Sequence, residues 1–212
     1  YPITLTGGSD NNYSFSLVDG TLSVTLVSQT ITFGALSDKT YGSSPFLLTG
    51  TASSGLAITY ASSNAAVATV SGSTVTIVGT GATTITASQS GNANYNSAAS
   101  VIQVLTVNKA SLTVTADDKS RAYGAANPTF TLSYSGFVNS EDTSVLTTAP
   151  NAATSASVIS DTGSYTIIPS GGVADNYTFS YINGTLSIGK APLTATADNK
   201  SRAQGVANPT LT

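Results

Sequence analysis

Apolar and polar residues alternate along most of this chain with a period of two. In YSFSLVDGTLSVTL (13–26) an apolar side chain occupies every second position on both sides of Asp19-Gly20. Such alternation is typical of strands that bury one face. No stretch keeps a helical period for two turns. The pattern predicts an all-β protein.

The 13–26 stretch also predicts a β-hairpin. Asp-Gly favours a two-residue type I′ turn because both central positions need a positive φ. With the turn at Asp19-Gly20, three apolar residues before it face three after it: Leu17 faces Leu22, Phe15 faces Val24, and Tyr13 faces Leu26. All six side chains then share one face.

Two further hairpins follow from the same signals. YTFSYINGTLSI (177–188) predicts a turn at Asn183-Gly184, with Tyr181 opposite Leu186 and Phe179 opposite Ile188. AVATVSGSTVTIVG (66–79) predicts a turn at Gly72-Ser73, with Val70 opposite Val75 and Ala68 opposite Ile77. GATTITAS and SVIQVLTV then predict strands whose inward residues are Ile85, Val101, Leu105 and Val107. Short strands in units of about 80–100 residues predict tandem antiparallel β-sandwiches of immunoglobulin-like type.

Two sequence segments each occur twice in the chain. KASLTVTADDKSRAYGAANPTFT begins at Lys109 and KAPLTATADNKSRAQGVANPTLT at Lys190, so the step between these two lysines is the length of one repeat. The opening phrase at Tyr1 returns at Tyr165 as YTIIPSGGVADNYTFSYINGTLSI. Repetition at a fixed step is the mark of a modular array. We expect the chain to be a slice through a longer one.

The repeat step divides the chain into four parts. Residues 109–189 form the complete copy, 1–26 the last part of a preceding copy, and 190–212 the first part of a following one. Residues 27–108 differ in sequence from the complete copy but contain the same short motifs. These include the Asp-Lys and Tyr-Gly pairs near residue 40 and an Asn-Tyr pair at residue 94. We interpret 27–108 as a module of the same architecture.

The 1–26 part is too small to be stable alone. Burial of its six apolar hairpin residues contributes at most roughly 9–18 kcal/mol, at ~1.5–3 kcal/mol each. Ordering about fourteen residues costs about 1–2 kcal/mol apiece. We therefore expect this part to have a partner strand from outside its own segment, from a neighbouring module or another copy of the chain.

Composition narrows the possible chemistry. The chain has no Cys, His, Met or Trp, and 7 Lys+Arg stand against 10 Asp+Glu. It therefore has no imidazole base, thiolate nucleophile or soft metal ligand. The charge balance gives no basic surface for nucleic acid, and no run of about 20 apolar residues predicts membrane insertion. We expect no enzyme.

Acidic residues after the first strand of each copy are the one metal-ligand candidate. Asp117, Asp118 and Asp198 lie near junctions between modules, where Ca²⁺ could stiffen the joint. Ca²⁺ takes six or more oxygen ligands, and Asp118 is replaced by Asn199 in the copy. The alternative is that these acids end a strand and pair with Lys119 or Arg121. Calcium is the only cofactor we consider.

Two other sites are open at this stage. Lys119, Asn127 and the single glutamate, Glu141, are the available set for an intramolecular Lys–Asn isopeptide bond, although charged residues are mostly exposed. Tyrosines could form a sugar-stacking platform. The sequence pattern places three of them in the core: Tyr13, Tyr177 and Tyr181. It leaves the location of three others undecided: Tyr41, Tyr60 and Tyr134.

The amino-acid sequence resembles two known families. The pattern LTVTADDKSRAYGAANPTFT…YSGF…NYTFSYINGTLSI of 109–188 resembles the MBG repeat of large bacterial surface proteins. The run from QTITFGALSDKTYGSSPF to SGNANYN, residues 29–96, resembles a bacterial Ig-like (Big) repeat, often interleaved with MBG. The resemblance implies secreted or surface-attached adhesins with the repeats as stalks, and it offers no catalytic residues. Gln204 replaces Tyr123 in the last copy.

Two functions of different classes follow. The first is a non-catalytic stalk or fibre segment of an extracellular bacterial adhesin, whose partners are neighbouring modules or copies of itself. Head-to-tail strand complementation between chains, giving a filament, is a variant. The second is a module that binds a surface glycan or a cell-surface protein through loops such as 88–97 or 147–164, since loops often carry binding.

Overall fold

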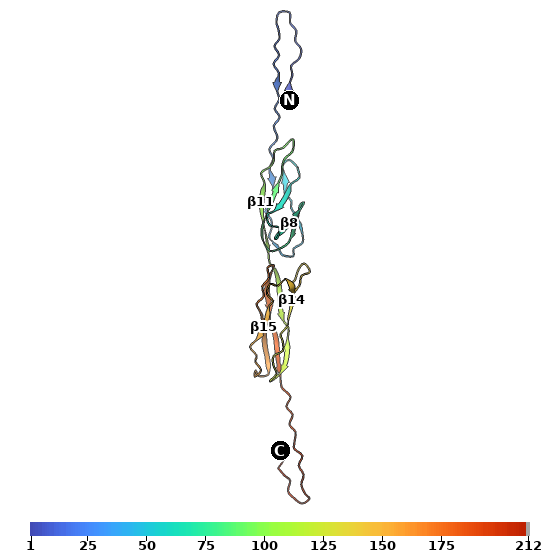
Figure 1. Ribbon diagram of the computed structural model, residues 1–212, viewed down its shortest axis with the longest axis vertical. Coiled ribbons are helices and arrows are strands. Elements are labelled where there is room, and N and C mark those ends of the chain that lie inside the picture. The colour runs from blue at the N-terminus through green and yellow to red at the C-terminus, as the bar shows by residue number, and fades with distance from the viewer. Residues whose placement is uncertain (211–212) are drawn as a thin grey trace. The chain divides into compact units, whose positions relative to one another are not determined.

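The computed structural model describes residues 1–210 and divides the chain into two compact units. The first unit is Tyr1–Lys109 and the second begins at Ala110 (Figure 1). Regular structure consists of strands β1–β18 and one short 3₁₀ helix among the described residues, η1 (Thr143–Val145). The predicted all-β class is confirmed, while the immunoglobulin-like assignment of the modules stays a prediction.

The first unit contains β1 to β11. Their bounds are β1 Pro2–Ile3, β2 Gly20–Thr21, β3 Ile31–Thr32, β4 Lys39–Thr40, β5 Phe46–Leu47, β6 Thr51–Ala52, β7 Thr59–Ser62, β8 Ala68–Ser71, β9 Thr74–Ile77, β10 Gly81–Ser88 and β11 Val101–Asn108. Outside the β1–β2 pair, the sheets have the orders β4-β11-β10-β7, β5-β9-β8 and β3-β6. The core includes Val75, Ile85 and Leu105, each fully buried.

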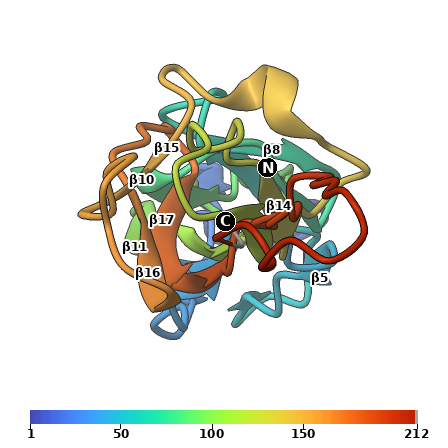
Figure 2. The ribbon, with the colours of Figure 1, turned by 90° about the horizontal axis from the view of Figure 1, so that it is seen from below.

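The second unit contains β12 to β18 in two sheets. Their bounds are β12 Ala110–Ala116, β13 Lys119–Ala122, β14 Leu132–Ser135, β15 Asn151–Thr154, β16 Gly163–Ser170, β17 Tyr177–Ile182 and β18 Gly184–Gly189. One sheet has the order β14-β12-β17 and the other β13-β18-β16-β15. Figure 2 labels β14 and β17, the outer strands of the first sheet.

The core of the second unit lies between its two sheets. Alternate residues of β12, Leu112 and Val114 among them, are fully buried, and so are Ile167 of β16 and Leu186 of β18. The intervening hydroxyl residues of β12 are partly or fully exposed, as Thr113 is. The period of two therefore decides which side chains meet in the core. Burial of such side chains contributes about 1.5–3 kcal/mol each.

The hairpin predicted at Gly72-Ser73 is confirmed together with its register. β8 and β9 are antiparallel, with Ala68 opposite Ile77 and Val70 opposite Val75. Gly72 has a φ of +59°, as a tight hairpin turn requires. The strands predicted after it are β10 and β11. Ile85, Leu105 and Val107 are buried, and Val101 is half-buried.

The hairpin predicted at Asn183-Gly184 is wrong. β17 and β18 belong to different sheets, where β17 pairs with β12 and β18 pairs with β13 and β16. Asn183 and Gly184 are therefore a crossing point between sheets and no turn. Neither residue has a positive φ, so the type I′ geometry that the sequence favours is not adopted.

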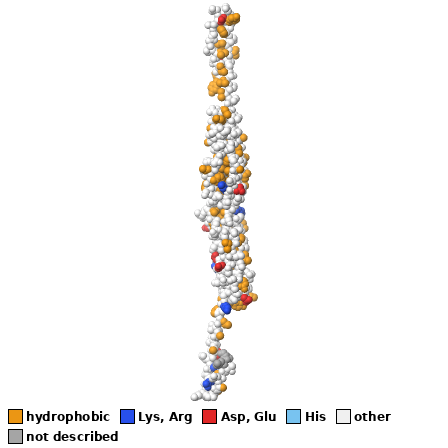
Figure 3. Space-filling view, turned by 180° about the vertical axis from the view of Figure 1, so that it is seen from behind, with side chains coloured by type: hydrophobic (Ala, Val, Ile, Leu, Met, Phe, Trp, Pro, Cys, Tyr) orange, Lys and Arg blue, Asp and Glu red, His pale blue; other side chains and the backbone are white. Residues whose placement is uncertain are grey.

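The hairpin predicted at Asp19-Gly20 is also wrong. Gly20 lies in β2, which pairs with β1 through Ile3, and residues 13–18 form no strand. Six residues that this hairpin was to pair are exposed: Tyr13, Phe15, Leu17, Leu22, Val24 and Leu26. The apolar side chains of this N-terminal segment are visible in the upper part of Figure 3.

The two end segments are the least covered parts of the chain. Among the described residues, strand pairing in residues 1–26 joins only β1 to β2, so the expected outside partner strand is not found within this chain. Residues 190–210 form no strand and are exposed, including Leu193 at 95%. The predicted part 190–212 extends over two residues that lie outside the described range.

No helix among the described residues has the length and apolar character needed to cross a membrane.

Candidate functional site: the parallel closure of each unit

The second unit is closed by pairing of its first and last segments. Ala110 pairs with Tyr177 in the first sheet, and Lys119 pairs with Leu186 in the second. The two residues of each pair are equally far apart in sequence, so one register holds across both sheets. Segments 110–122 and 177–189 therefore run in parallel along their whole length. The sequence prediction of purely antiparallel sheets is wrong at these strands.

Both segments change sheets at the same level. β12 is followed by Asp117 and Asp118 before β13 begins, and β17 is followed by Asn183 before β18 begins. The Thr185 backbone N–H donates to Oδ1 of Asp118 at 2.6 Å, which joins the two crossing points. A hydrogen bond to a carboxylate is stronger than one between neutral groups. The acid thus bonds the two segments at the level where neither ladder pairs them.

Gly184 is needed at this level for space. A Cβ on Gly184 would lie 2.4 Å from the carbonyl oxygen of Ala116 and 2.9 Å from its carbonyl carbon. Backbone atoms at that distance cannot move aside as a flexible side chain can. The glycine of the Asn-Gly pair therefore permits close approach of two backbones. Its ability to adopt a positive φ is not used here.

An Asn-Tyr pair lies at the start of the closure. The Ala110 N–H donates to the Asn176 carbonyl oxygen at 3.0 Å. The neighbouring Tyr177 is 2% exposed, its hydroxyl donates to Glu141, and the same hydroxyl accepts from the Val138 N–H at 3.1 Å. The buried phenol thereby fills space in the core and also hydrogen-bonds to two residues of the loop, Val138 and Glu141.

A Tyr-Gly turn lies at the end of the closure. The Tyr123 N–H donates to the Gly189 carbonyl oxygen at 2.8 Å, and the Ala125 N–H donates to the Ala122 carbonyl oxygen at 3.2 Å. Gly124 has a φ of +80°, the value that the third position of a type II turn requires. The turn ends β13 directly after its last contact with β18.

The first unit is closed in the same way. Val27 forms a parallel bridge with Tyr95, and Lys39 pairs in parallel with Val107, with the same separation in sequence for both pairs. The Val27 N–H donates to the carbonyl oxygen of Asn94, in another Asn-Tyr pair, at 2.9 Å. The two units therefore have the same parallel closure although their amino-acid sequences differ.

The Tyr-Gly turn also recurs in the first unit. The Tyr41 N–H donates to the Asn108 carbonyl oxygen at 2.8 Å, and Gly42 has a φ of +86°. Gly205 in the C-terminal segment has a φ of +83° although Gln204 replaces the tyrosine. The glycine is therefore the residue that the turn requires.

The calcium candidates are not brought together as a ligand set. Oδ1 of Asp118 accepts from Thr185, and Asp117 accepts from the hydroxyls of Thr131 and of Ser133, the latter at 2.7 Å. Oδ2 of Asp198 lies 3.7 Å from the ammonium of Lys200. The described residues contain no group of three acidic side chains that could hold a metal ion. Calcium binding stays a prediction.

Hydrogen bonding controls the ionisation of Asp117. The Thr131 hydroxyl, then the Ser133 hydroxyl, and to a smaller extent the charge of Lys119 hold the pKa of Asp117 below its ordinary value of 3.8. Each of these groups favours the ionised carboxylate. Asp117 therefore fixes the end of β12 against β14 rather than offering free oxygens.

The isopeptide candidates have separate partners. Asn127 accepts from Nε of Arg121 at 2.7 Å and donates to the Ala156 carbonyl oxygen at 2.7 Å. Glu141 accepts from the Tyr177 hydroxyl. These contacts place the amide and the acid in different hydrogen-bond networks. A Lys119–Asn127 bond is not supported by this arrangement.

The six tyrosines considered for a sugar platform differ widely in exposure. Of the three expected in the core, Tyr177 is buried, Tyr181 is 38% exposed and Tyr13 is 77% exposed. Among the undecided ones, Tyr41 is buried, and Tyr60 and Tyr134 are half-buried. Burial raises the pKa of the Tyr134 hydroxyl, and nearby Tyr181 raises it further. The sequence prediction is confirmed for Tyr177 and wrong for Tyr13 and Tyr181, which are exposed.

The two proposed binding loops are largely used by the fold. In 88–97 the side chain of Asn92 accepts from the N–H groups of Asn94 and Tyr95, and Gln89 accepts from buried Gln29 at 2.8 Å. The 147–164 stretch is only partly a loop, because it contains β15, which pairs with β16 and leaves residues 155–162 as the connection between them. In the 88–97 loop the amide side chains of Asn92 and Gln89 are thus used in internal hydrogen bonds.

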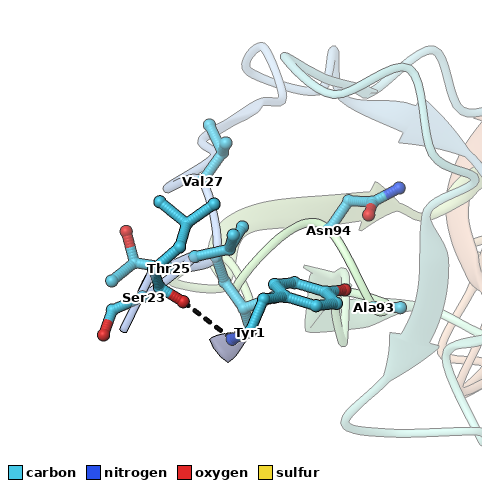
Figure 4. Close-up of a pocket in the computed structure, with 9 residues that line it drawn as sticks. Tyr1, Ser23, Thr25, Val27, Ala93 and Asn94 are labelled. Atoms are coloured by element: carbon cyan, nitrogen blue, oxygen red, sulfur yellow. Dashed lines mark hydrogen bonds between the residues drawn. The ribbon is translucent and has the colours of Figure 1, made fainter. Parts of the chain in front are cut away.

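An open hollow of about 620 Å³ lies beside residues 22–27 (Figure 4). Its walls are Leu22 to Val27, with Tyr1, Ala93 and Asn94. The Tyr1 backbone nitrogen donates to the Leu22 carbonyl oxygen at 2.9 Å. The hollow therefore exposes one edge of the segment that continues β2, and it contains no acidic or basic side chain.

A comparison with protein families gives a match to part of the second unit. Residues 112–187 match the MBG domain (YGX type), and Tyr123-Gly124-Ala125 is the Tyr-Gly turn described above. This part of the chain is thus similar to MBG-type repeats, a non-catalytic family that occurs in bacterial surface proteins. A comparison with curated proteins gives no match.

Proposed function

We propose that the chain is a load-bearing, non-catalytic stalk segment of a large extracellular bacterial adhesin. The observation that carries this proposal is the parallel closure, in which segment 110–122 pairs with segment 177–189. The chain enters a unit through the first segment and leaves through the second. In a parallel pair the entry of one strand and the exit of the other lie at opposite ends.

This arrangement determines how a pulling force acts. Force applied between the two ends of the unit is directed along the strands, so the ladder bonds of both sheets are loaded together in shear. Force applied at one end of the pair would instead break the bonds one after another. A module that resists extension suits a stalk, and the match of residues 112–187 to a repeat family of bacterial surface proteins supports the cellular setting.

Single-molecule pulling on the 212-residue chain tests this function. The chain has no cysteine, so Lys109→Cys with Lys190→Cys attaches handles that shear the closure. Lys109→Cys with Asp175→Cys attaches both handles at one end of the same strand pair. We expect a severalfold higher unfolding force in the shearing geometry. Equal forces in the two geometries would overturn the load-bearing role.

The length gained in each pull identifies the unit that unfolds. Between residues 109 and 190 the chain can extend by at most ~3.3–3.6 Å per residue, so unfolding of the second unit gives a gain of roughly 250 Å in contour length. The variant Leu112→Ala, which removes a fully buried side chain, should lower that force and leave the first unit unaffected.

A further inference from the structure

We infer that Asn183-Gly184 is a chemical modification site whose reaction is blocked while the second unit is closed. In the open chain the Gly184 backbone nitrogen attacks the side-chain carbonyl carbon of Asn183. A nitrogen–carbon bond forms, the side-chain amide bond breaks, and ammonia leaves with the proton that the Gly184 nitrogen gives up. Water then opens the resulting cyclic imide to aspartate or isoaspartate. The inference concerns the closure alone and holds whether or not the units bear load.

The pair combines the two residue types that favour this reaction most. Asparagine places its side-chain carbonyl carbon within reach of the next backbone nitrogen, and glycine leaves that nitrogen unhindered because it has no Cβ. Asn183-Gly184 is the only Asn-Gly pair in the sequence. The closure itself requires this glycine, because the Ala116 carbonyl oxygen lies where a Cβ would be. The fold therefore imposes the residue that makes Asn183 reactive.

The electrophilic group, the Asn183 side-chain amide, is free to react. Asn183 lies between β17 and β18, and its side chain is exposed. Over residues 1–210 its amide group takes part in no hydrogen bond. Protection of the pair must therefore come from the nucleophilic group.

The nucleophilic group, the Gly184 nitrogen, is buried and held in a strand ladder. Gly184 pairs with Ile167 of β16 in an antiparallel register. Successive N–H groups of a strand point to opposite edges, and the Thr185 N–H points to Asp118 on the side away from β16. The Gly184 N–H therefore points toward β16, where Gly184 and Ile167 form a hydrogen-bonded pair.

This arrangement blocks the attack in two ways. The Gly184 nitrogen must lose its proton and turn toward the Asn183 side chain, whereas in the closed unit that proton is used in the ladder with β16. The Ala116 backbone also lies against Gly184, where a Cβ would be 2.4 Å from the carbonyl oxygen, so the peptide unit has no room to rotate. Opening of the closure removes both restraints together.

The isoaspartate product does not fit the closed unit. In isoaspartate the chain runs through the former side-chain carbon, which adds one backbone atom between β17 and β18. The closure uses a single register across the crossing, since β12 pairs with β17 before it and β13 with β18 after it. An added atom in only one of the two segments breaks this match. A unit that reacts while open is therefore marked permanently and cannot close in its original register.

Hydroxylamine cleavage of the whole 212-residue chain tests the inference, because hydroxylamine attacks the imide and cuts the chain between Asn183 and Gly184. Cleavage in buffer should be at least about tenfold slower than in guanidinium chloride that unfolds both units, since only the open fraction reacts. Asn183→Gln, whose longer side chain does not form this imide, should stay uncut at this position in denaturant.

Two matched leucine substitutions show which opening controls the reaction. Leu112 in the second unit and Leu105 in the first are both fully buried. Leu112→Ala leaves a cavity, so it should raise the rate of cleavage in buffer at least about tenfold. Leu105→Ala should leave that rate unchanged. Asp118→Ala, a milder change in the second unit, should give an intermediate rate, and all these chains should be cut equally fast in denaturant.

Refolding tests the permanence of the mark. The chain is kept in guanidinium chloride without hydroxylamine until the Asn183 amide is lost, and the isoaspartate fraction is separated. On dilution this fraction should regain the calorimetric transition of the first unit and not that of the second. Asn183→Gln, treated for the same time, should regain both. Asn183→Asp, refolded after brief unfolding, should also regain both, because it has the carboxylate without the added backbone atom.

Any of three outcomes would overturn the inference. One is cleavage in buffer as fast as in denaturant, which would show that the closed unit does not protect the pair. Another is equal acceleration by Leu112→Ala and by Leu105→Ala. The third is an isoaspartate fraction that regains the transition of the second unit at the original temperature.

Discussion

Asp118 accepts a hydrogen bond from the backbone N–H of Thr185 at 2.6 Å, although the two residues are far apart in sequence. The same separation in sequence relates every pair in the closure of the second unit. The contact lies where both segments leave one sheet for the other. It therefore joins the two halves of a single long parallel pair.

Removing the Asp118 side chain should destabilise the second unit. Asp118→Ala leaves the Thr185 N–H without its protein acceptor, and we expect a loss of about 1 kcal/mol. Asp118→Asn should restore most of it, since Asn199 holds this position in the repeated phrase. Calorimetry of the whole chain measures the effect, with Leu112→Ala identifying the transition of the second unit. Equal values for Asp118→Ala and for Asp161→Ala, at an exposed acid, would contradict the assignment.

The Tyr-Gly turn should depend on its glycine. Gly124→Ala places a Cβ at a φ of +80° and should cost about 1–2 kcal/mol. Gly189→Ala is the control, because its φ is not positive and its Cβ position is 4.0 Å from the nearest atom. Tyr123→Gln should change stability by less than about 0.5 kcal/mol, as expected for an exposed side chain. A larger loss for Tyr123→Gln than for Gly124→Ala would reverse this ranking.

The buried phenol of the Asn-Tyr pair should contribute through its hydroxyl. Tyr177→Phe keeps the ring but leaves the Val138 N–H without its acceptor, and we expect a loss of about 1–2 kcal/mol. Tyr181→Phe, at a partly exposed ring, should have little effect. Denaturant unfolding followed by tyrosine fluorescence compares the two variants. Similar midpoints would show that the Tyr177 hydroxyl is dispensable.

Acid should remove the contribution of Asp117. The folded-state pKa of Asp117 lies below its ordinary value of 3.8, so the unfolded chain binds the proton more readily. The stabilisation is therefore fully present above the ordinary pKa and is lost as pH falls through the folded value. The difference in unfolding midpoint between the unsubstituted chain and Asp117→Asn should shrink below about pH 4. In a Thr131→Val background that change with pH should be smaller.

Local alternation predicted the strands well and their pairing only in part. Gly72 and Gly184 both follow a β-type run and precede another, yet only Gly72 has a positive φ. At Gly184 the flanking strands pair with β12, β13 and β16 instead of with each other. A period of two specifies which face of a strand is buried, but it does not specify which strand pairs with its edge. A partner so distant in sequence could not be found from neighbouring residues.

In the sequence, the parallel closure was visible only as short residue pairs that recur in both units. Asn-Tyr at residues 94 and 176 and Tyr-Gly at 41 and 123 recur in both units. Their function is non-local, since Asn176 accepts from Ala110 and Tyr123 donates to Gly189. Asp117 and Asp118 were candidate metal ligands because acidity is a local property. Their hydrogen-bond partners, which come from other strands, depend on the fold.

The measurement that tests the parallel closure most directly uses two cysteine pairs in a chain that has no cysteine of its own. In the closure Ser187 pairs with Ser120, whereas a hairpin at Asn183-Gly184 would place it opposite Ser180. Paired strands lie about 5 Å apart, within disulfide reach. The closure predicts a disulfide in Ser120→Cys/Ser187→Cys and none in Ser180→Cys/Ser187→Cys. A disulfide in the second variant alone would contradict it.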